Sequence, residues 1–296
     1  MRGAQEKRKR LRVMAGNSSF TALKLARSYG FDRPKNYRQE VKWYRRAADL
    51  GNVEAQNLLG ECYRDGHGVR RNLGLGIKLL SLAAERGESN AQVSIGYQYF
   101  YGENLKQDKS KAINWYQKAA ARGQLNALSN LGLAYRSGEG VKRDYRMSRK
   151  WFRKAAAQNH IRSMFWIGHS YWWAEGVKED LRSSFEWFWK AARYGDAEAN
   201  TYVGICFHDG LVVKEDFKKA LKHYRLGSKG DPYAQYCVGL CYRDGEGAKK
   251  SKRLCLLWRK KAAANGEKAA KRAIKRLAIN EASLNPRRDS LRRDSV

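Results

Sequence analysis

LGLAYRSGEGVKRDYRMSRKWFRKAAA, at residues 131–157, decides the fold, because its features return along the chain at a fixed interval. Gly132 interrupts an apolar helical pattern, and glycine recurs at that position in other units: Gly60, Gly96, Gly168, Gly204 and Gly239. The interval is 36 residues, and 35 before the last of these glycines. A period of this length indicates stacked structural repeats.

Two further positions keep this period and mark turns. The first holds Gly30, Gly66, Gly102, Gly138, Gly210 and Gly245, with Ala174 in the remaining unit. The second holds Gly51, Gly87, Gly123, Gly195, Gly230 and Gly266, with Asn159 in the remaining unit. Each unit therefore reads as a helix, a glycine-rich turn, a second helix and a short turn into the next unit.

The second helix of every unit has a predicted N-cap. Six residues after the glycine position of the first turn, each repeat has a residue whose side chain accepts hydrogen bonds from the free N–H groups at a helix start: Asn36, Asn72, Asp108, Asp144, Asp180, Asp216 and Ser251. Asp231-Pro232 also predicts the start of a first helix, because proline is favoured directly after an N-cap.

Bulky pairs and then small pairs follow each cap, as Trp151-Phe152 and Ala155-Ala156 do here. This spacing places both pairs on one helix face, which we expect to be buried. We expect Gly132 to leave room for the Ala155-Ala156 side of the second helix, with the two rings filling the space beyond. The pattern predicts an all-α solenoid.

The units resemble Sel-one-like repeats (SLR), relatives of tetratricopeptide repeats with a longer loop between the two helices. The resemblance rests on AQNLLGECYRDGHGVRRN, NALSNLGLAYRSGEGVKRDYRMSRKWFRKAAAQN and AQYCVGLCYRDGEGAKK. It implies a right-handed α/α superhelical solenoid of about six to seven helix-turn-helix repeats of 36 residues. It also implies an interaction role with a protein or peptide partner. The cysteine-rich secreted branch is not matched, because Cys62, Cys206 and Cys241 share one repeat position instead of pairing within a repeat.

The repeat register divides the chain into segments. We expect a basic disordered N-terminus at 1–16, a degenerate repeat at 17–50, six repeats at 51–265, a capping helix at 266–281 and a basic disordered tail at 282–296. The tail repeats Arg-Arg-Asp-Ser, ending at Ser290 and Ser295. These serines are either phosphorylation sites for a basophilic kinase or part of an unmodified basic tail.

Charge and composition bound the partners and the compartment. The chain has 60 Lys and Arg against 29 Asp and Glu, a formal charge of +31, which favours an acidic protein, nucleic acid or an anionic membrane surface. Five cysteines without paired spacing, and no apolar stretch long enough to cross a membrane, indicate a soluble cytoplasmic protein. The KRKRLR run at Lys7–Arg12 is either a nuclear localisation signal in a eukaryotic host or a solvated basic end. Oligomeric state stays open.

No catalytic, metal or cofactor pattern stands out. The GEG loop at 138–140 lacks the GKS or GKT ending of a phosphate-binding loop and follows a helix instead of a strand. Gly168-His169-Ser170 lacks the second glycine of a nucleophile elbow, and the histidines have no HExxH spacing. We therefore expect a protein that is not an enzyme and has no cofactor.

Aromatic residues on the first helices are the candidates for partner binding. In solenoids of paired helices the first helices usually line the concave surface. The candidates are Tyr97, Tyr101, Arg162, Trp166, His169, Trp173 and Tyr202. The alternative is that neighbouring repeats bury these rings. Trp172 and Trp189 also break the repeat pattern, and we expect them to be partly exposed.

A basic face is predicted on the second helix of the opening stretch. Its residues are Arg146, Arg149, Lys150, Arg153 and Lys154, opposite a stripe expected to be buried: Tyr145, Ser148, Trp151, Phe152 and Ala155. Such a face is either simply solvated or part of a positive surface.

Two functions follow from these patterns. The first is a non-catalytic adaptor or scaffold that binds a protein through the concave face, for which Trp166→Ala or Trp173→Ala should lose the partner and leave the melting temperature unchanged. The alternative is polyanion or nucleic-acid binding through the basic surface, with affinity that falls steeply with salt.

Overall fold

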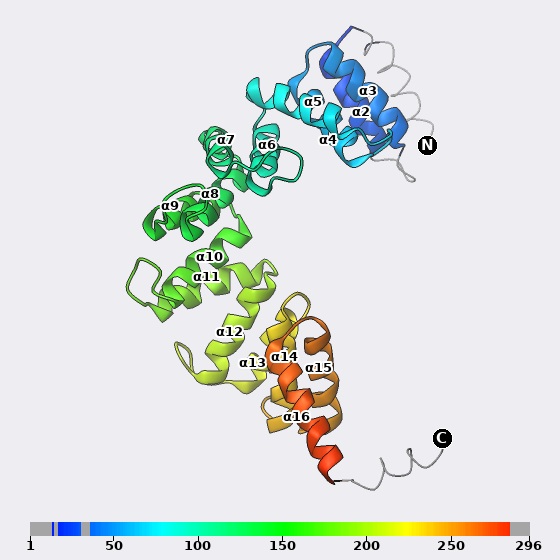
Figure 1. The fold of residues 1–296 in the computed structure, drawn as a ribbon. Coiled ribbons are helices and arrows are strands. Elements are labelled where there is room, and N and C mark those ends of the chain that lie inside the picture. The colour runs from blue at the N-terminus through cyan, green and yellow to red at the C-terminus, as the bar shows by residue number, and fades with distance from the viewer. Residues whose placement is uncertain (1–13, 15–16, 31–35, 285–296) are drawn as a thin grey trace, which may run out of the picture. The chain divides into compact units, whose positions relative to one another are not determined.

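The computed structural model describes residues 14, 17–30 and 36–284, with side chains up to residue 277. Fifteen helices and no strand occur among these residues, so the predicted all-α fold is confirmed (Figure 1). The first helices of the repeats, called A helices below, are α2 (Ser19–Gly30), α4 (Val53–Asp65), α6 (Ser89–Tyr101), α8 (Leu125–Ser137), α10 (Ile161–Trp172), α12 (Ala197–Asp209) and α14 (Pro232–Asp244). The second helices, called B helices, are α3 (Tyr37–Asp49), α5 (Leu73–Glu85), α7 (Lys109–Ala121), α9 (Tyr145–Ala156), α11 (Leu181–Arg193), α13 (Phe217–Gly227) and α15 (Lys252–Ala264). A last helix, α16 (Lys268–Leu284), follows α15.

The helices form two compact units, residues 1–155 and 156–296. In the first unit α2 packs on α3, α4 on α5 and α6 on α7, and each of these B helices also packs on the A helix that follows it. The second unit has the same order from α10 to α15, and α15 packs on α16. Within each unit, these B helices therefore join their own repeat to the next one.

The seven predicted N-caps of the B helices are confirmed. Each side chain accepts a hydrogen bond from the backbone N–H three residues later, as Asp144 does from Met147 at 2.9 Å. Asp231 caps α14 with proline at the first helical position, also as predicted. Glu88, Gln124 and His160 cap A helices by the same bond, which their residue types did not indicate.

The A-helix glycine makes room for a ring of the B helix. A Cβ atom built on Gly132 would lie 2.5 Å from Cε1 of Phe152. The second residue of the bulky pair covers the glycine in other repeats too: Tyr116 over Gly96, Phe188 over Gly168 and Tyr224 over Gly204. The close approach was predicted, but the expected partner, the Ala155-Ala156 side of the helix, was wrong, because the ring itself lies on the glycine.

The first turn follows the A helices of the second to seventh repeats in a left-handed conformation. Gly138 has φ of +79°, and Gly66, Gly102, Gly210 and Gly245 behave alike, whereas Gly30 in the first repeat does not have a positive φ. Ala174 has φ of 52° and Asn159 has φ of 62°, so the two residues that replace turn glycines keep the glycine conformation. Asparagine tolerates this region, whereas alanine is strained there.

Ala174→Gly is expected to stabilise the protein by about 0.5 kcal/mol. The left-handed conformation costs a non-glycine residue about 1 kcal/mol, and the greater freedom of glycine in the unfolded chain offsets part of the gain. Thermal unfolding followed by circular dichroism measures the change. Ala157→Gly is the control, because Ala157 is an exposed turn residue without positive φ and should lose stability. A loss of stability at both positions would contradict the expectation.

The GEG loop binds the preceding repeat. A Cβ atom built on Gly140, the last glycine of the loop, would lie 2.6 Å from the carbonyl oxygen of Lys109. In the GEG loop at 245–247, a Cβ atom built on Gly247 would lie 2.2 Å from the carbonyl oxygen of Phe217. The glutamate between the glycines pairs with a cation of the preceding repeat: Glu139 with Lys109 Nζ at 2.6 Å and Glu246 with His208 Nε2 at 2.9 Å. The loop thus holds neighbouring repeats together.

The pairing of His208 predicts a dependence of stability on pH. Burial disfavours its charged form, but hydrogen bonds to Asp209 and Glu246 outweigh burial and raise the pKa of His208 above its ordinary 6.5. Because the folded pKa is raised, this stabilisation is present below pH 6.5 and is lost as the pH rises through the folded pKa. We expect the difference in denaturation midpoint between the wild type and His208→Gln to shrink as the pH rises from about 6 to 8. A difference that does not vary with pH would refute the assignment.

Candidate functional site

In the first unit, Tyr97 and Tyr101 of α6 lie together on the surface. Their ring centroids are 4.4 Å apart, and the residues are 41% and 56% exposed. They line a pocket of about 250 Å³ between α6, α7 and α8, called the tyrosine pocket below. Its other lining residues are Phe100, Tyr116, Asn130, Leu133, Arg136, Ser137 and Glu139.

The tyrosine pocket has an apolar wall and a polar edge. Burial raises the pKa of both Tyr97 and Tyr116, so these phenols are neutral at physiological pH. Glu139 at the edge is bound to Lys109, which lowers the pKa of its carboxyl and keeps it charged. The pocket can therefore take an apolar side chain of a ligand while its edge hydrogen-bonds to the ligand's backbone.

In the second unit, four of the candidate residues form one aromatic surface. This tryptophan surface consists of Trp166, His169, Trp173 and Tyr202 from α10 and α12 and the turn after α10. The His169 ring lies 5.3 Å from Trp166 and 6.2 Å from Trp173. Trp173 Nε1 donates to the Tyr202 hydroxyl at 3.4 Å. The sequence pattern therefore named residues that the fold brings together.

The members of the tryptophan surface differ in exposure. Trp173 is 59% exposed. Trp166, His169 and Tyr202 are half-buried, and the Tyr202 ring stacks on the buried Phe188 at 4.4 Å. Neighbouring helices thus bury most of this cluster, as the second alternative from the sequence expects, and leave Trp173 accessible. That Trp173 binds a partner stays a prediction.

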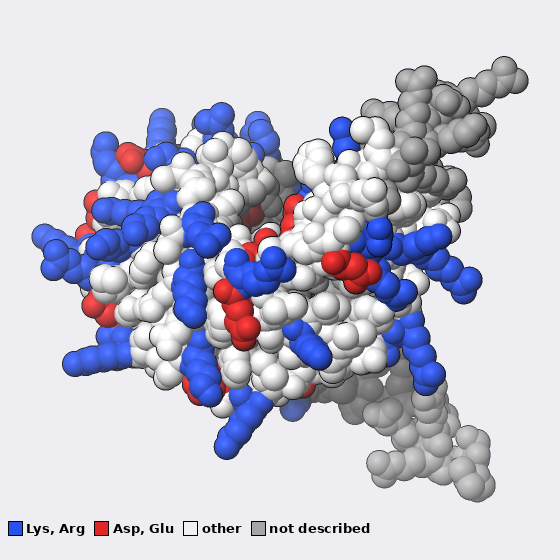
Figure 2. All heavy atoms as spheres, turned by 90° about the horizontal axis from the view of Figure 1, so that it is seen from above, with Lys and Arg blue, Asp and Glu red and all other residues white. Residues whose placement is uncertain are grey.

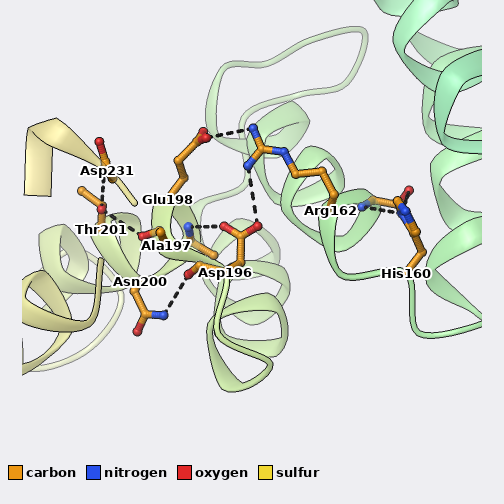
Figure 3. Close-up of polar contacts among 10 residues, drawn as sticks. His160, Arg162, Asp196, Ala197, Glu198, Asn200, Thr201 and Asp231 are labelled. Carbon is orange, nitrogen blue, oxygen red and sulfur yellow. Dashed lines mark hydrogen bonds and ion pairs between the residues drawn. The ribbon is translucent and has the colours of Figure 1, made fainter. Parts of the chain in front are cut away.

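Arg162 is held by acidic side chains at the start of the next A helix, α12 (Figure 3). Its guanidinium lies 2.9 Å from Glu198 Oε1 and 3.6 Å from Asp196 Oδ2. It also lies over the rings of Phe165 at 4.3 Å and Trp166 at 5.1 Å. We therefore place Arg162 as a residue that joins α10 to α12 and supports the Trp166 ring. Thr201 and Asp231 link α12 to α14 similarly, by a bond of 2.6 Å.

The other two pattern-breaking tryptophans are partly exposed, as predicted. Trp172 is half-buried beside Tyr202, with ring centroids 5.2 Å apart. Trp189 is 37% exposed and belongs to a different surface, on α11 beside His223 of α13.

The predicted basic face on α9 lies at the surface. Arg146, Lys150, Arg153 and Lys154 are exposed, and Arg149 is half-buried. In the opposite stripe Ser148, Phe152 and Ala155 are buried, but Tyr145 and Trp151 are half-buried, so the expectation was wrong for these two. Lys154 of the same helix lies over the Trp151 ring at 4.5 Å.

Stacking of lysine on tryptophan repeats along the B helices. The same contact occurs for Lys118 over Trp115, Lys190 over Trp187 and Lys261 over Trp258, at 4.2 to 4.9 Å. The sequence analysis missed this use of the tryptophans, although the spacing of three residues signals it. On the face shown in Figure 2, Lys and Arg side chains are spread over the surface with Asp and Glu among them.

The remaining predictions from the sequence concern the two ends of the chain, metal binding, membrane-spanning segments and the cysteines. Ser290, Ser295 and the Lys7–Arg12 run lie outside the described residues. Within the described part of the chain, no three His, Cys, Asp or Glu side chains gather as a metal site would require. Nor does any helix of that part have the length and apolar character to cross a membrane. All five cysteines are free thiols.

Comparison with known proteins identifies the repeats. The Sel1 repeat family matches residues 20–52, 53–88, 89–124, 125–160, 161–196, 197–231 and 232–267. No curated protein matches the chain significantly. Solved structures similar to it include c5321, a protective antigen of uropathogenic Escherichia coli with an SLR fold (30% identity, TM-score 0.75), and a Sel1 repeat protein from Oxalobacter formigenes (28% identity, TM-score 0.74).

These similarities cover most of the chain. The E. coli match covers 88% of it and the Oxalobacter match 92%. The chain spans 57% of the length of the E. coli protein and 80% of the other. Sel1 repeat proteins generally mediate protein–protein interactions. With seven matched repeats in register with its helix pairs, the chain belongs to the Sel1 repeat family.

Proposed function

We propose that the chain is a non-catalytic adaptor that binds a protein or peptide segment through exposed aromatic side chains of its A helices. The observation that carries this proposal is the tyrosine pocket, an apolar hollow of about 250 Å³ with a polar edge. That volume is below the range of small-molecule sites and suits a single apolar side chain of a peptide.

The choice of aromatic residues also supports binding. Tyrosine and tryptophan contribute large contact areas at low cost in conformational entropy and dominate interface hot spots. Tyr101 and Trp173 occupy the same position of the repeat, five residues after the A-helix glycine. Each of the two compact units thus presents one strongly exposed ring at this repeat position, Tyr101 in the first and Trp173 in the second.

Affinity capture tests the adaptor function. The immobilised full chain is incubated with lysate of the source cells, with and without nuclease, and retained proteins are quantified by mass spectrometry. We expect a protein partner to be retained after nuclease treatment. The double variant Tyr97→Ala/Tyr101→Ala should retain at least about tenfold less of it, the effect of one hot spot.

Leu257→Ala is the matched control, because Leu257 is 58% exposed on the B helix α15. It should retain the partner like the wild type. Retention of the partner by the double variant at the level of the wild type would contradict binding at the tyrosine pocket. Retention that disappears with nuclease would instead favour the second function.

The second candidate function is polyanion binding, favoured by the Lys–Trp stacks on the B helices. A lysine held over a ring loses less conformational freedom when its ammonium binds a phosphate. Binding to a nucleic acid would show log K falling linearly with log salt, with a slope reduced by about 2 in Arg146→Ala/Lys150→Ala if both residues contact phosphates. Affinity that does not change between low and physiological salt would exclude this function.

A cytoplasmic location belongs to the same proposal. Cys206, Cys237 and Cys241 are buried free thiols, and burial is the main cause that raises the pKa of each. Buried unpaired thiols suit a reducing compartment.

A further inference from the structure

A second hollow lies away from the A-helix candidates, between the B helices α11 and α13. It has a volume of about 450 Å³. Trp189 and Ala192 of α11 and Leu226 of α13 provide its apolar surface. Arg193, Lys222 and Lys229 surround that surface. We call this hollow the α13 groove.

The positive charge continues on the other side of α13. A neighbouring hollow of about 380 Å³ shares Lys222, Leu226 and Lys229 with the α13 groove and adds Lys218 and Arg225. No Asp or Glu is among the residues that line either hollow. Five cations around an apolar surface therefore complement a ligand that carries several negative charges and an apolar group.

His223 contributes a neutral ring to the α13 groove. Asn200 uses its amide N–H groups on the carbonyls of Ala192 and Asp196, so its oxygen faces His223 Nδ1 at 3.0 Å and accepts from it. Burial, and then the charge of Lys222, lower the pKa of His223. The charge of the groove thus comes from lysine and arginine alone.

The surroundings of Trp189 argue against stacking of a nucleic-acid base. Phe185 stacks on the ring with centroids 5.7 Å apart and an interplanar angle of 28°, and His223 lies 5.4 Å away. Phe207 meets it edge-on at 6.3 Å. Base binding on aromatic platforms needs an open ring face. Trp189, 37% exposed, instead offers an apolar wall beside Leu226.

We propose that the α13 groove binds an acidic peptide segment that carries an apolar anchor residue. The anchor lies against Trp189 and Leu226, and carboxylates on either side pair with Arg193, Lys222 and Lys229. This site is separate from the A-helix surfaces, so an adaptor could hold two partners at once. The site does not depend on the tyrosine pocket.

Fluorescence anisotropy with a labelled, end-blocked peptide of sequence EDEDLEDED tests the proposal on the full chain at low salt. Lys222→Ala/Lys229→Ala is expected to weaken binding about tenfold, because two carboxylate partners are lost. Lys252→Ala/Lys260→Ala removes the same charge from exposed positions of α15 and should change the affinity less than about twofold.

Trp189→Arg separates the apolar anchor from simple attraction of charges. Arginine occupies this repeat position at Arg45, Arg153 and Arg225, so the fold accepts it there. The variant gains a positive charge but loses the apolar wall. The proposal predicts binding about tenfold weaker, whereas charge attraction alone predicts tighter binding. Circular dichroism and the melting temperature check that the variant is folded.

Three results would overturn the proposal. They are no saturable binding of the peptide, equal binding of a peptide with serine in place of the leucine, and Trp189→Arg binding at least as tightly as the wild type. An oligouridylate that competes for the groove as well as the peptide would also overturn it, in favour of a nucleic-acid site.

Discussion

Gly247→Ala is expected to lower the free energy of unfolding of the C-terminal repeats by about 3 kcal/mol. Gly247 has φ of +71°, a conformation that costs alanine about 1 kcal/mol. Its Cβ atom would also lie 2.2 Å from the carbonyl oxygen of Phe217 and 2.7 Å from the carbonyl carbon. Because Phe217 begins α13 directly after its N-cap, Asp216, the backbone there cannot move without disturbing the helix start.

Gly266→Ala is the matched control for this effect. Gly266 also has positive φ, +99°, but a Cβ atom there would have no neighbour within 4 Å. The free energy of unfolding should therefore fall by only about 1 kcal/mol, the cost of the left-handed conformation to alanine. Chemical denaturation followed by circular dichroism compares the two variants, and hydrogen exchange reports whether α14 and α15 open first. Equal losses for both variants would show that the contact with Phe217 contributes nothing.

Trp173→Ala is expected to weaken partner binding at least about tenfold and to leave the melting temperature within about 2 °C of the wild type. The side chain follows α10 and is 59% exposed, so its removal opens no cavity in the core.

Trp166→Ala is expected to lower the stability of the protein, whereas the sequence alone predicted an unchanged melting temperature. Its ring is half-buried under Arg162, and its loss should cost about 2 kcal/mol of stability.

Isothermal titration with a partner identified by affinity capture measures both variants, and thermal unfolding measures their stability. Leu257→Ala again controls for loss of an exposed apolar side chain. Unchanged affinity of Trp173→Ala would remove the tryptophan surface from the binding site. A drop in melting temperature as large as that of Trp166→Ala would show that Trp173 acts through the fold.

The sequence predicted those features that depend on local chemistry within one repeat. Caps such as Asp144 and turn conformations such as that of Gly138 follow from residue type and the distance along the chain. Even the exceptions, Asn159 and Ala174, were located correctly, because the period required a turn there.

Contacts between helices were harder to predict. The pattern placed Gly132 near a B helix but could not decide which of its side chains covers the glycine, since that depends on the crossing of the two helices. Arg162 looked like a binding residue because its acidic partners lie at the start of the next A helix, 34 and 36 residues further along the chain. The α13 groove arises from two B helices that are adjacent only in the folded chain, so no sequence motif announces it.

The second glycine of the turn after an A helix, Gly140 in the GEG loop and Gly68 in the corresponding GHG loop, also determines where the array can be divided. Gly68 and Gly140 join repeats 1 to 2 and 3 to 4 in the first unit by lying against Tyr37 and Lys109. At the boundary between repeats 2 and 3 this position holds Asn104, which lacks the positive φ of the glycines. A fragment of the first unit that ends at Glu88 therefore keeps the contact of Gly68 with Tyr37 and separates no glycine of this kind from its partner. A cut after Gly123 instead separates Gly140 from Lys109.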